Sequence, residues 1–295
     1  MTDGPSDPPG SVTVHFVRVG RFGDDGRVDS DTAAYYELGL EHSRLFLDGR
    51  PGLEYTRTLE LLGRLLPPAP ARLLDVGGGT GVYAVALAER GYTVHVVDPI
   101  PVHVERTLEH ARERGIAGVM ASLGDARDLR LFDGDHDAVL LLGPLYHLVD
   151  ADDRALAWRE AVRVTKPGGV VVAVGISRYA SLIDGLKRRL LDDPVFRSMV
   201  ARDLRDGQHR NPDVTNRPEL FTTAYFHLPA ELENEARASG LRDVQLYAVE
   251  GCAGILEDPD QQENQLFAAR ATESEPALMA ASSHILVAGT TPAST

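Results

Sequence analysis

The stretch from residue 73 to residue 81 constrains the fold of this chain more than any other. Its apolar run carries Asp75 and leads into the turn Gly77-Gly78-Gly79-Thr80-Gly81. A helix-forming stretch follows the turn directly, and a second β-branched run then ends at Asp98. A strand, a glycine turn, a helix and a strand that ends in a carboxylate predict half of a nucleoside-binding α/β fold.

The glycine turn also narrows the ligand. Glycines let a ligand approach the backbone, because a Cβ in the turn would block it. Asp98 lies 19 positions after Gly79, where a carboxylate can accept hydrogen bonds from ribose hydroxyls. Dinucleotides such as NAD and S-adenosylmethionine both use this arrangement. The dinucleotide fingerprint requires a small residue where this chain has Val82, and Asp75 would repel a pyrophosphate but suits an ammonium group. The residues therefore favour the sulfonium cofactor.

Apolar runs and helix-length stretches alternate through the middle of the chain. Because strands separated by helices form parallel sheets, this order predicts a doubly wound α/β fold with helices on both faces. Ligands of such sheets bind at the carboxyl ends of the strands. The expected strands are 72–76, 92–98, 117–122, 137–142, 170–176, 242–249 and 283–288, and the expected helices are 80–90, 101–115, 152–165 and 229–239.

The segment 177–228 interrupts this alternation. It has helical patterns near 179–191 and 195–206, where a minimal fold would pass directly to its next helix. An insertion after the fifth strand would overhang the carboxyl ends of the strands, so we interpret it as a substrate lid. The predicted organisation is a disordered or weakly structured N-terminus (1–30) and one domain (31–295), which comprises an N-terminal helical cap (31–70), a cofactor-binding core (71–176), the lid (177–228) and the C-terminal part of the sheet (229–295).

Four motifs at the ends of expected strands resemble those of one enzyme family. They are the acid-and-glycine motif at 75–81, Asp98, Gly-Asp-Ala at 124–126 and Lys-Pro-Gly-Gly at 166–169. Through residues 35–175 the chain resembles the class I S-adenosylmethionine-dependent methyltransferases of the small-molecule type. The resemblance implies a Rossmann-like sheet of seven strands in the order 3-2-1-4-5-7-6, whose last two strands form an antiparallel hairpin. In this chain 33 residues (250–282) separate those two strands, far more than a usual hairpin loop.

The resemblance also implies an activity. It is the transfer of a methyl group from S-adenosylmethionine to an oxygen or nitrogen of a small-molecule metabolite. Two other functions stay open. One is an NAD(P)-dependent oxidoreductase, which Val82 and Asp75 disfavour, and the other is a non-catalytic module that binds S-adenosylmethionine as a sensor.

Position along the strands predicts the cofactor contacts. Asp98 would take the ribose hydroxyls, and Asp125 would accept a hydrogen bond from the adenine amino group or cap a helix. Arg57 would clamp the cofactor carboxylate, or else pair with Glu54 or Glu60 on its own helix. The family resemblance implies that Tyr35 and Tyr36 close over the cofactor, and the alternative is that they only pack in their helix. The predicted cofactor-binding set is Tyr35, Tyr36, Arg57, Asp75, Gly77, Gly79, Gly81, Asp98, Pro99, Asp125, Ala126 and Leu142.

The segment 142–148 follows the fourth strand and is expected beside the methyl group that would be transferred. Methyl transfer is an in-line displacement, so the protein must align the acceptor and remove its proton where needed. His147 is the predicted base, because its reference pKa of ~6.5 suits proton transfer near neutral pH, and Tyr146 is predicted to orient the acceptor. The alternative is a loop hydrogen bond for His147 and a core position for Tyr146. The predicted substrate contacts in the lid are Arg178, Tyr179, Tyr225 and His227.

The amino-acid composition limits the classes of molecule that the chain is expected to bind. The formal net charge of −14 argues against a nucleic-acid substrate, since phosphate neutralisation needs a basic surface. A small-molecule methyl acceptor is therefore the expected partner, and the oligomeric state stays open, a homodimer included. The single cysteine, Cys252, argues against a disulfide framework and fits the cytoplasm.

Three further expectations concern the membrane, export and metals. No apolar run reaches the ~18 residues of a membrane span, and the N-terminus lacks the basic and apolar parts of a signal peptide. His103 and His110 lie seven positions apart on one expected helix. Both are expected to be exposed, and no metal site is predicted.

Overall fold

The computed structural model describes residues 35, 45–47, 49–256 and 259–293. The predicted N-terminal segment 1–30, Tyr36 and most of the first helix expected in the cap lie outside these residues. The described part of the cap is mainly a short antiparallel pair, β1 (Phe46–Leu47) and β2 (Arg50–Pro51), followed by the helix α3 (Leu53–Leu65).

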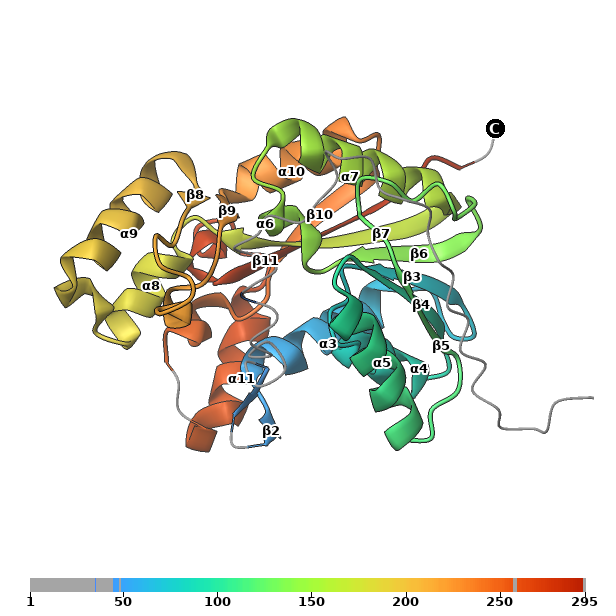
Figure 1. Cartoon of the computed structure of the whole chain (residues 1–295), viewed down its shortest axis with the longest axis horizontal. Helices are drawn as coiled ribbons and strands as arrows, with labels where there is room; N and C mark the ends of the chain where they lie inside the picture. The colour runs from blue at the N-terminus through green and yellow to red at the C-terminus, as the bar shows by residue number, and fades with distance from the viewer. Residues whose placement is uncertain (1–34, 36–44, 48, 257–258, 294–295) are drawn as a thin grey trace, which may run out of the picture.

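The central sheet has the order that the family resemblance implies. Its main path is β10-β11-β7-β6-β3-β4-β5 (Figure 1). From the β5 edge, with β3 counted as the first strand, this path reads 3-2-1-4-5-7-6. Neighbours from β5 to β7 are parallel, whereas β11 is antiparallel to both β7 and β10. The strands are β3 (Arg72–Val76), β4 (Thr93–Asp98), β5 (Val119–Leu123), β6 (His136–Leu141), β7 (Thr165–Ser177), β10 (Arg242–Ala248) and β11 (His284–Thr290).

Helices bury both faces of this sheet, as expected for a doubly wound fold. In β3, Leu73 packs in the core under α3, α4 and α5, while Leu74 packs in the core under α7 and α10. Each leucine is fully buried, which stabilises the fold by roughly 1.5–3 kcal/mol per side chain. Figure 1 shows these two helical layers on opposite sides of the strands. The helices are α4 (Val82–Ala88), α5 (Pro101–Glu113), α7 (Ala151–Val164) and α10 (Pro229–Ala238).

The insertion after β7 has the expected helices and two strands that the sequence did not predict. Helices α8 (Ala180–Lys187) and α9 (Pro194–Asp206) flank the 3₁₀ helix η1 (Leu190–Asp192) and lie beyond one end of the sheet (Figure 1). Strand β9 (Ala224–His227) pairs in parallel with the end of β7 and antiparallel with β8 (Gln208–His209). Strands of four and two residues are too short to show a period of two. Backbone hydrogen bonds therefore attach the insertion to the sheet.

The long segment between β10 and β11 is also structured. It contains the helix α11 (Gln262–Thr272), which packs beside α3 (Figure 1). Its other elements are the 3₁₀ helices η3 (Gly251–Ile255), η4 (Pro259–Gln261) and η5 (Met279–Ala281), and the remaining short elements of the chain are α6 (Pro144–His147) and η2 (Pro218–Leu220). Within the described ranges, no helix combines the length and apolar character needed to cross a lipid bilayer.

Candidate functional site

A cavity of about 420 Å³ opens at the carboxyl ends of the central parallel strands. This is the edge of an open α/β sheet where ligands bind. Its size falls within the range of small-molecule sites. Ten of the predicted site residues line the cavity: Asp75, Gly77, Gly79, Asp98, Pro99, Asp125, Ala126, Leu142, Tyr146 and His147.

The glycine turn shapes one wall of the cavity. Gly77 has a φ of +69°, and a Cβ at that position would lie 2.8 Å from Cδ of Pro144. Gly81 also has a left-handed φ, of +74°, but it does not line the cavity. A Cβ on Gly81 would lie 2.6 Å from Cγ2 of Thr107 on α5. The requirement for glycine at position 81 is therefore helix packing, and the prediction that Gly81 contacts the cofactor is not supported.

Asp75 is the most unusual side chain of the cavity. It is completely buried, and neither of its carboxylate oxygens has a hydrogen-bond partner among the described residues. Burial, reinforced by the nearby charge of Asp98, raises the pKa of Asp75 to about 7. A buried acid without a partner costs free energy unless a ligand supplies donors or positive charge. Asp75 therefore indicates a ligand with a cationic or hydrogen-bond-donating group.

Asp98 ends β4 and is held firmly at the cavity wall. Its Oδ2 accepts a hydrogen bond from the backbone N–H of Gly79 (2.9 Å), and its Oδ1 accepts one from Ile100 (2.9 Å). Nδ1 of His103 lies 3.0 Å from Oδ1. His103 is buried and lines the cavity, so the expectation that it is exposed is wrong. His103 lies in the first turn of α5, and helical side chains lean toward the N-terminus of their helix, which here is next to the end of β4.

Asp125 lies after β5 and is bound to a residue that the sequence analysis missed. Its carboxylate accepts hydrogen bonds from the backbone N–H of Arg127 (2.8 Å) and from the guanidinium of the same residue (2.8 Å and 2.9 Å). Arg127 also donates to Asp153 (2.7 Å) and lines the cavity. The structure assigns a turn rather than an α-helix at Ala126, so the helix-cap alternative for Asp125 is wrong.

Tyr146 and His147 lie on α6, directly after the Gly143-Pro144 turn. Tyr146 is buried, and its ring contacts the ring of His147 edge-on at 4.7 Å between centroids. The ring of Phe221, from the insertion, lies 5.9 Å from that of His147 and 5.4 Å from that of Tyr35. Phe221 has a φ of +67°, which is rare for a bulky residue. The insertion thus reaches the predicted catalytic segment through a strained residue.

Arg57 does not line the cavity, contrary to the prediction of a clamp on the cofactor carboxylate. It is fully buried, pairs with Glu60 and Glu273, and donates from Nε to the carbonyl of Val249 (3.3 Å). The alternative ion pair with Glu60 is therefore present, but Arg57 is buried in it and does not lie at the surface. Successive helix residues are rotated by about 100°, so Thr58 faces the cavity while Arg57 faces α11. Tyr35 is buried and likewise is not among the cavity residues.

The four predicted substrate contacts of the insertion also lie outside the cavity wall. Arg178 is buried and donates to the carbonyl of Phe226 (2.7 Å) and to Glu231 (2.7 Å). Tyr225 lies under the guanidinium of Arg154, His227 is fully buried 3.4 Å from Glu235, and Tyr179 is exposed before α8. Arg178, Tyr225 and His227 thus connect β9 with the end of β7 and with α10. The insertion residues that do line the cavity are Arg210 and Thr223.

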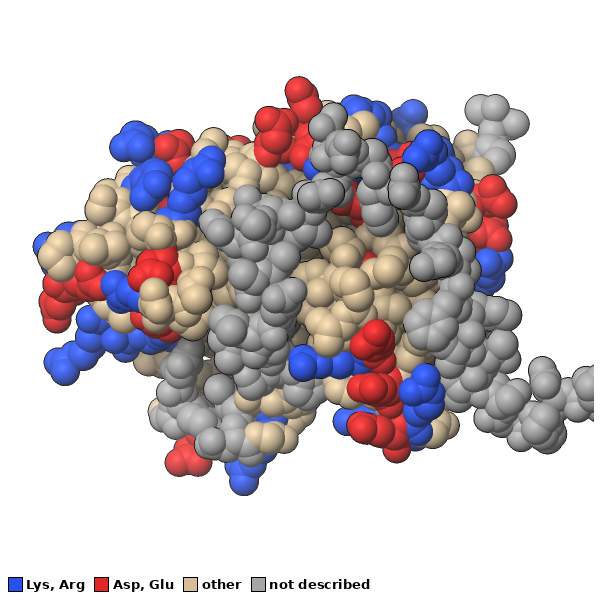
Figure 2. Space-filling view, viewed as in Figure 1, with Lys and Arg blue, Asp and Glu red and all other residues tan. Residues whose placement is uncertain are grey.

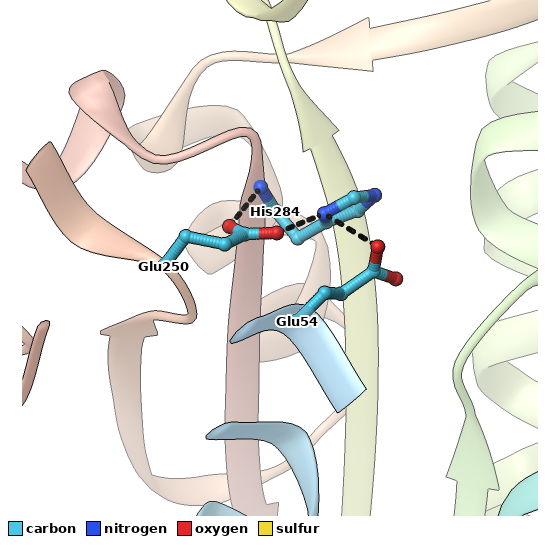
Figure 3. Close-up of side chains that lie close together, drawn as sticks. All are labelled: Glu54, Glu250 and His284. Carbon is cyan, nitrogen blue, oxygen red and sulfur yellow. Dashed lines mark hydrogen bonds and ion pairs between the residues drawn. The ribbon is translucent and has the colours of Figure 1, made fainter. Parts of the chain in front are cut away.

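The far wall of the cavity contains a cluster that the sequence analysis did not predict. Glu54 on α3 and His284 at the start of β11 both line the cavity. Figure 3 shows Nδ1 of His284 between two carboxylates, 2.5 Å from Glu250 Oε1 and 3.7 Å from Glu54 Oε2. The three residues come from three distant segments, and no local spacing in the sequence indicates that they meet.

Comparison with known proteins gives one consistent result. Residues 73–169 match the family model described as a methyltransferase domain. An uncharacterized methyltransferase of Mycobacterium tuberculosis is 39% identical over 168 residues, which are 57% of this chain and 60% of that relative. A ubiquinone biosynthesis O-methyltransferase of Azorhizobium caulinodans is 30% identical over 199 residues, 66% of each chain. The similarity thus spans about 60% of the length of the first of these relatives.

Solved structures agree on the fold. The S-adenosylmethionine-dependent methyltransferase of Methanosarcina mazei superposes with a TM-score of 0.52 at 19% identity. The match covers 79% of this chain and 98% of that one. It shows that the sheet and its helical layers are arranged as in that protein.

Proposed function

Because the chain carries a class I S-adenosylmethionine-dependent methyltransferase domain, we propose that it transfers a methyl group from S-adenosylmethionine to an oxygen or nitrogen of a small-molecule metabolite. The observation that carries this proposal is Asp75. It is a buried carboxylate without a protein partner in the described residues, next to a glycine turn and 23 positions ahead of the carboxylate that ends β4.

The cavity residues fit the cofactor part by part. Asp98 would hold the ribose hydroxyls, and Asp125 with Ala126 would recognise the adenine edge. Asp75 would face the ammonium group of the methionine part, either directly or through water. When bound, the cofactor would supply a methyl group on a positively charged sulfur. The acidic wall suits that charge.

A histidine of the cavity is proposed to remove the acceptor proton. Two histidines line its acceptor side, His147 on α6, which the sequence predicted as the base, and His284 on β11. Tyr146, packed against His147, is proposed to border the path of the methyl group. Imidazole suits proton transfer near neutral pH.

A labelled-methyl experiment tests turnover. The purified chain is incubated with a metabolite extract and S-adenosylmethionine that carries a heavy methyl group. Mass spectrometry should then detect a labelled product heavier than its precursor by one methylene plus the label. Binding of the donor with no labelled product would support the sensor alternative. An NAD(P)-dependent change in the extract with no methyl transfer would support the oxidoreductase alternative.

A further inference from the structure

The cluster at the far wall is built around a fixed carboxylate. Oε2 of Glu250 accepts hydrogen bonds from Ser282 Oγ (2.8 Å) and from the backbone N–H of His284 (3.0 Å). Ser282 Oγ in turn accepts from the backbone N–H groups of Glu250 and Gly251. Burial opposes the ionisation of Glu250, but its interaction with the His284 ring and these hydrogen bonds lower its pKa below the usual value. Glu250 is therefore an ionised, immobile partner for the histidine.

Glu250 fixes the orientation of the His284 ring. An ionised carboxylate only accepts hydrogen bonds, so Nδ1 of His284, 2.5 Å from Oε1, carries the proton. Figure 3 shows Nε2 on the side of the ring away from Glu250. His284 lines the cavity, and we assign Nε2 as the ring nitrogen that meets a ligand there. A carboxylate that holds one imidazole nitrogen while the other exchanges a proton is the arrangement of a general base.

The charge of the cavity favours a cationic acceptor. Among the residues that the structure describes, six carboxylates line it but only two guanidinium groups, Arg127 and Arg210. Arg127 is already paired with Asp125 and Asp153 at the nucleoside end. Arg210 is exposed, so water screens its charge. Glu54 lies at the opposite end, next to His284, with a side chain that is 21% exposed.

The cluster also lies within reach of the predicted methyl position. Strands β6, β7 and β11 are neighbours in the sheet, and the cavity is lined by Leu142 after β6, Val174 of β7 and His284 at the start of β11. Two strand spacings of ~4.8 Å, together with the offset of two residues along β7 between Val174 and Ile176, put the backbones of Leu142 and His284 about 12 Å apart. The imidazole covers part of that distance, which leaves room for a small acceptor group.

We propose that Glu54 and His284 form the acceptor subsite, that the acceptor is an amine which enters as its ammonium ion, and that His284 takes its proton. This inference rests on the proposed function and assigns the base to His284 rather than His147. An N–H bond of the ammonium breaks, the proton moves to Nε2, and the electron pair stays on nitrogen. That pair forms the new N–C bond while the bond between the methyl carbon and sulfur breaks, its electrons remaining on sulfur.

A bound metal ion is the competing account of the cluster. Glu54, Glu250 and His284 offer three ligand atoms within 4.8 Å of one another. However, Nδ1 and Oε1 are at hydrogen-bond distance, and Oε2 of Glu250 already accepts from Ser282 and a backbone N–H. A metal on Nδ1 would have to displace this network. We therefore assign proton transfer to the cluster and treat metal dependence as an outcome of the test.

The test combines product identification with three variants. The labelled product from the metabolite extract is purified, and carbon NMR identifies the atom that carries the methyl group. Kinetics on its precursor are then measured for Glu54→Gln, His284→Gln and Glu250→Gln, with and without EDTA. Glu105→Gln, an exposed acid on α5, serves as the control. Calorimetry with S-adenosylhomocysteine shows for every variant whether the fold and the cofactor site are kept.

An N-methylated amine as product is expected. His284→Gln should lower kcat by roughly 100-fold or more, and Glu54→Gln should mainly raise KM, about tenfold. Glu250 acts as a positioning residue, so Glu250→Gln should lower kcat and move the rising limb of the pH profile to lower pH. The charged groups that face His284 in the described structure are Glu54 on α3 and Glu250 after β10.

Three results would overturn the inference. They are an O- or C-methylated product, wild-type kinetics for His284→Gln, or activity that EDTA abolishes and a divalent metal restores. Methyl transfer continues or is restored in each case, so the proposed function stands for all of these results except a C-methylated product, which would also contradict its oxygen or nitrogen acceptor. A chain that binds neither S-adenosylhomocysteine nor transfers any methyl group would instead overturn both.

Discussion

Asp75 is the buried side chain whose surroundings indicate most clearly that a ligand binds in the cavity. Its position was readable from the sequence, since an acid precedes the glycine turn. The absence of a hydrogen-bond partner for it among the described residues was not readable, because that depends on how the turn at Gly78 packs against its carboxylate. A Cβ at position 78 would lie 2.6 Å from Oδ2 of Asp75. The glycine turn therefore leaves just enough space for the carboxylate.

Asp75 should make both stability and cofactor affinity depend on pH. Its pKa is raised from 3.8 to about 7 in the folded chain. Its contribution to the stability of the ligand-free protein is therefore fully present below pH 4 and lost as the pH rises through 7. Asp75→Asn should accordingly become more stable than wild type over that range, by at most roughly 4 kcal/mol. Urea unfolding at pH 5 and pH 8 measures the difference.

The ionised carboxylate of Asp75 lowers the stability of the ligand-free protein, but it should raise the affinity for the cofactor. Wild-type affinity for S-adenosylmethionine should rise from pH 6 to pH 8, because only the ionised carboxylate attracts its ammonium group. Asp75→Asn should bind about 10- to 100-fold more weakly at pH 8 and lose this pH dependence. Calorimetry at pH 6 and pH 8 measures these affinities. If Asp75→Asn binds S-adenosylmethionine as tightly as wild type, the proposed contact between Asp75 and the ammonium group is contradicted.

Gly81 should matter for packing and not for direct contact with the cofactor. Gly81→Ala combines a left-handed φ with a Cβ 2.6 Å from Thr107, so it should destabilise the fold by about 2 to 5 kcal/mol. Gly115 is the matched control, since its φ is +64° but no atom lies within 4 Å of an added Cβ. Gly115→Ala should cost only about 1–2 kcal/mol. Equal losses in denaturant unfolding would count against this explanation.

At the scale of whole elements, the pairing of α3 with α11 decides what Arg57 does. Arg57→Ala would leave the carbonyl of Val249 and two acids short of a partner, so a loss of about 3 kcal/mol in unfolding free energy is expected. Arg64→Ala, which removes an exposed ion pair with Glu273, should cost less than about 1 kcal/mol. Arg57→Ala should also keep its affinity for S-adenosylhomocysteine within about twofold. A loss of affinity of more than tenfold would instead support the predicted contact between Arg57 and the cofactor carboxylate.

The interpretation of residues 177–228 as a lid stays a prediction, and Phe221 tests it. This residue joins the insertion to Tyr35 and His147 through ring contacts. Phe221→Ala should raise KM for the methyl acceptor at least about fivefold and leave cofactor affinity unchanged. Leu186→Ala, an exposed position on α8 of the same insertion, is the control. If both variants keep wild-type KM, the insertion does not close over the acceptor.

Long strands and helices could be predicted from the sequence. Contacts between residues that lie far apart along the chain could not. Strand order followed from strand-end motifs and the family resemblance, and the cavity wall from Asp75 to Ala126 followed from position along those strands. β9 is too short to show its period. Arg57 turns toward α11, an element absent from the expected list, and the meeting of Glu54, Glu250 and His284 depends on how that 33-residue segment packs.

At the scale of the whole molecule, the net charge of the chain and the charged groups of the cavity favour the same class of ligand. On the face that Figure 2 shows, described basic side chains are interspersed with acidic ones around the edge, and described uncharged residues lie between them. The formal net charge of −14 and the carboxylates of the cavity both favour cationic small molecules over nucleic acids. The sulfonium cofactor and the proposed ammonium acceptor both carry the positive charge that these carboxylates favour.

The most direct measurement of the central claim is calorimetric titration of the purified chain with S-adenosylhomocysteine and, separately, with NAD. We predict binding of S-adenosylhomocysteine, no binding of NAD, and a loss of affinity of at least about tenfold in Asp98→Ala but not in Asp152→Ala, an exposed acid on α7. Binding of NAD alone, or an Asp98→Ala variant that keeps wild-type affinity, would contradict the assignment of this cavity.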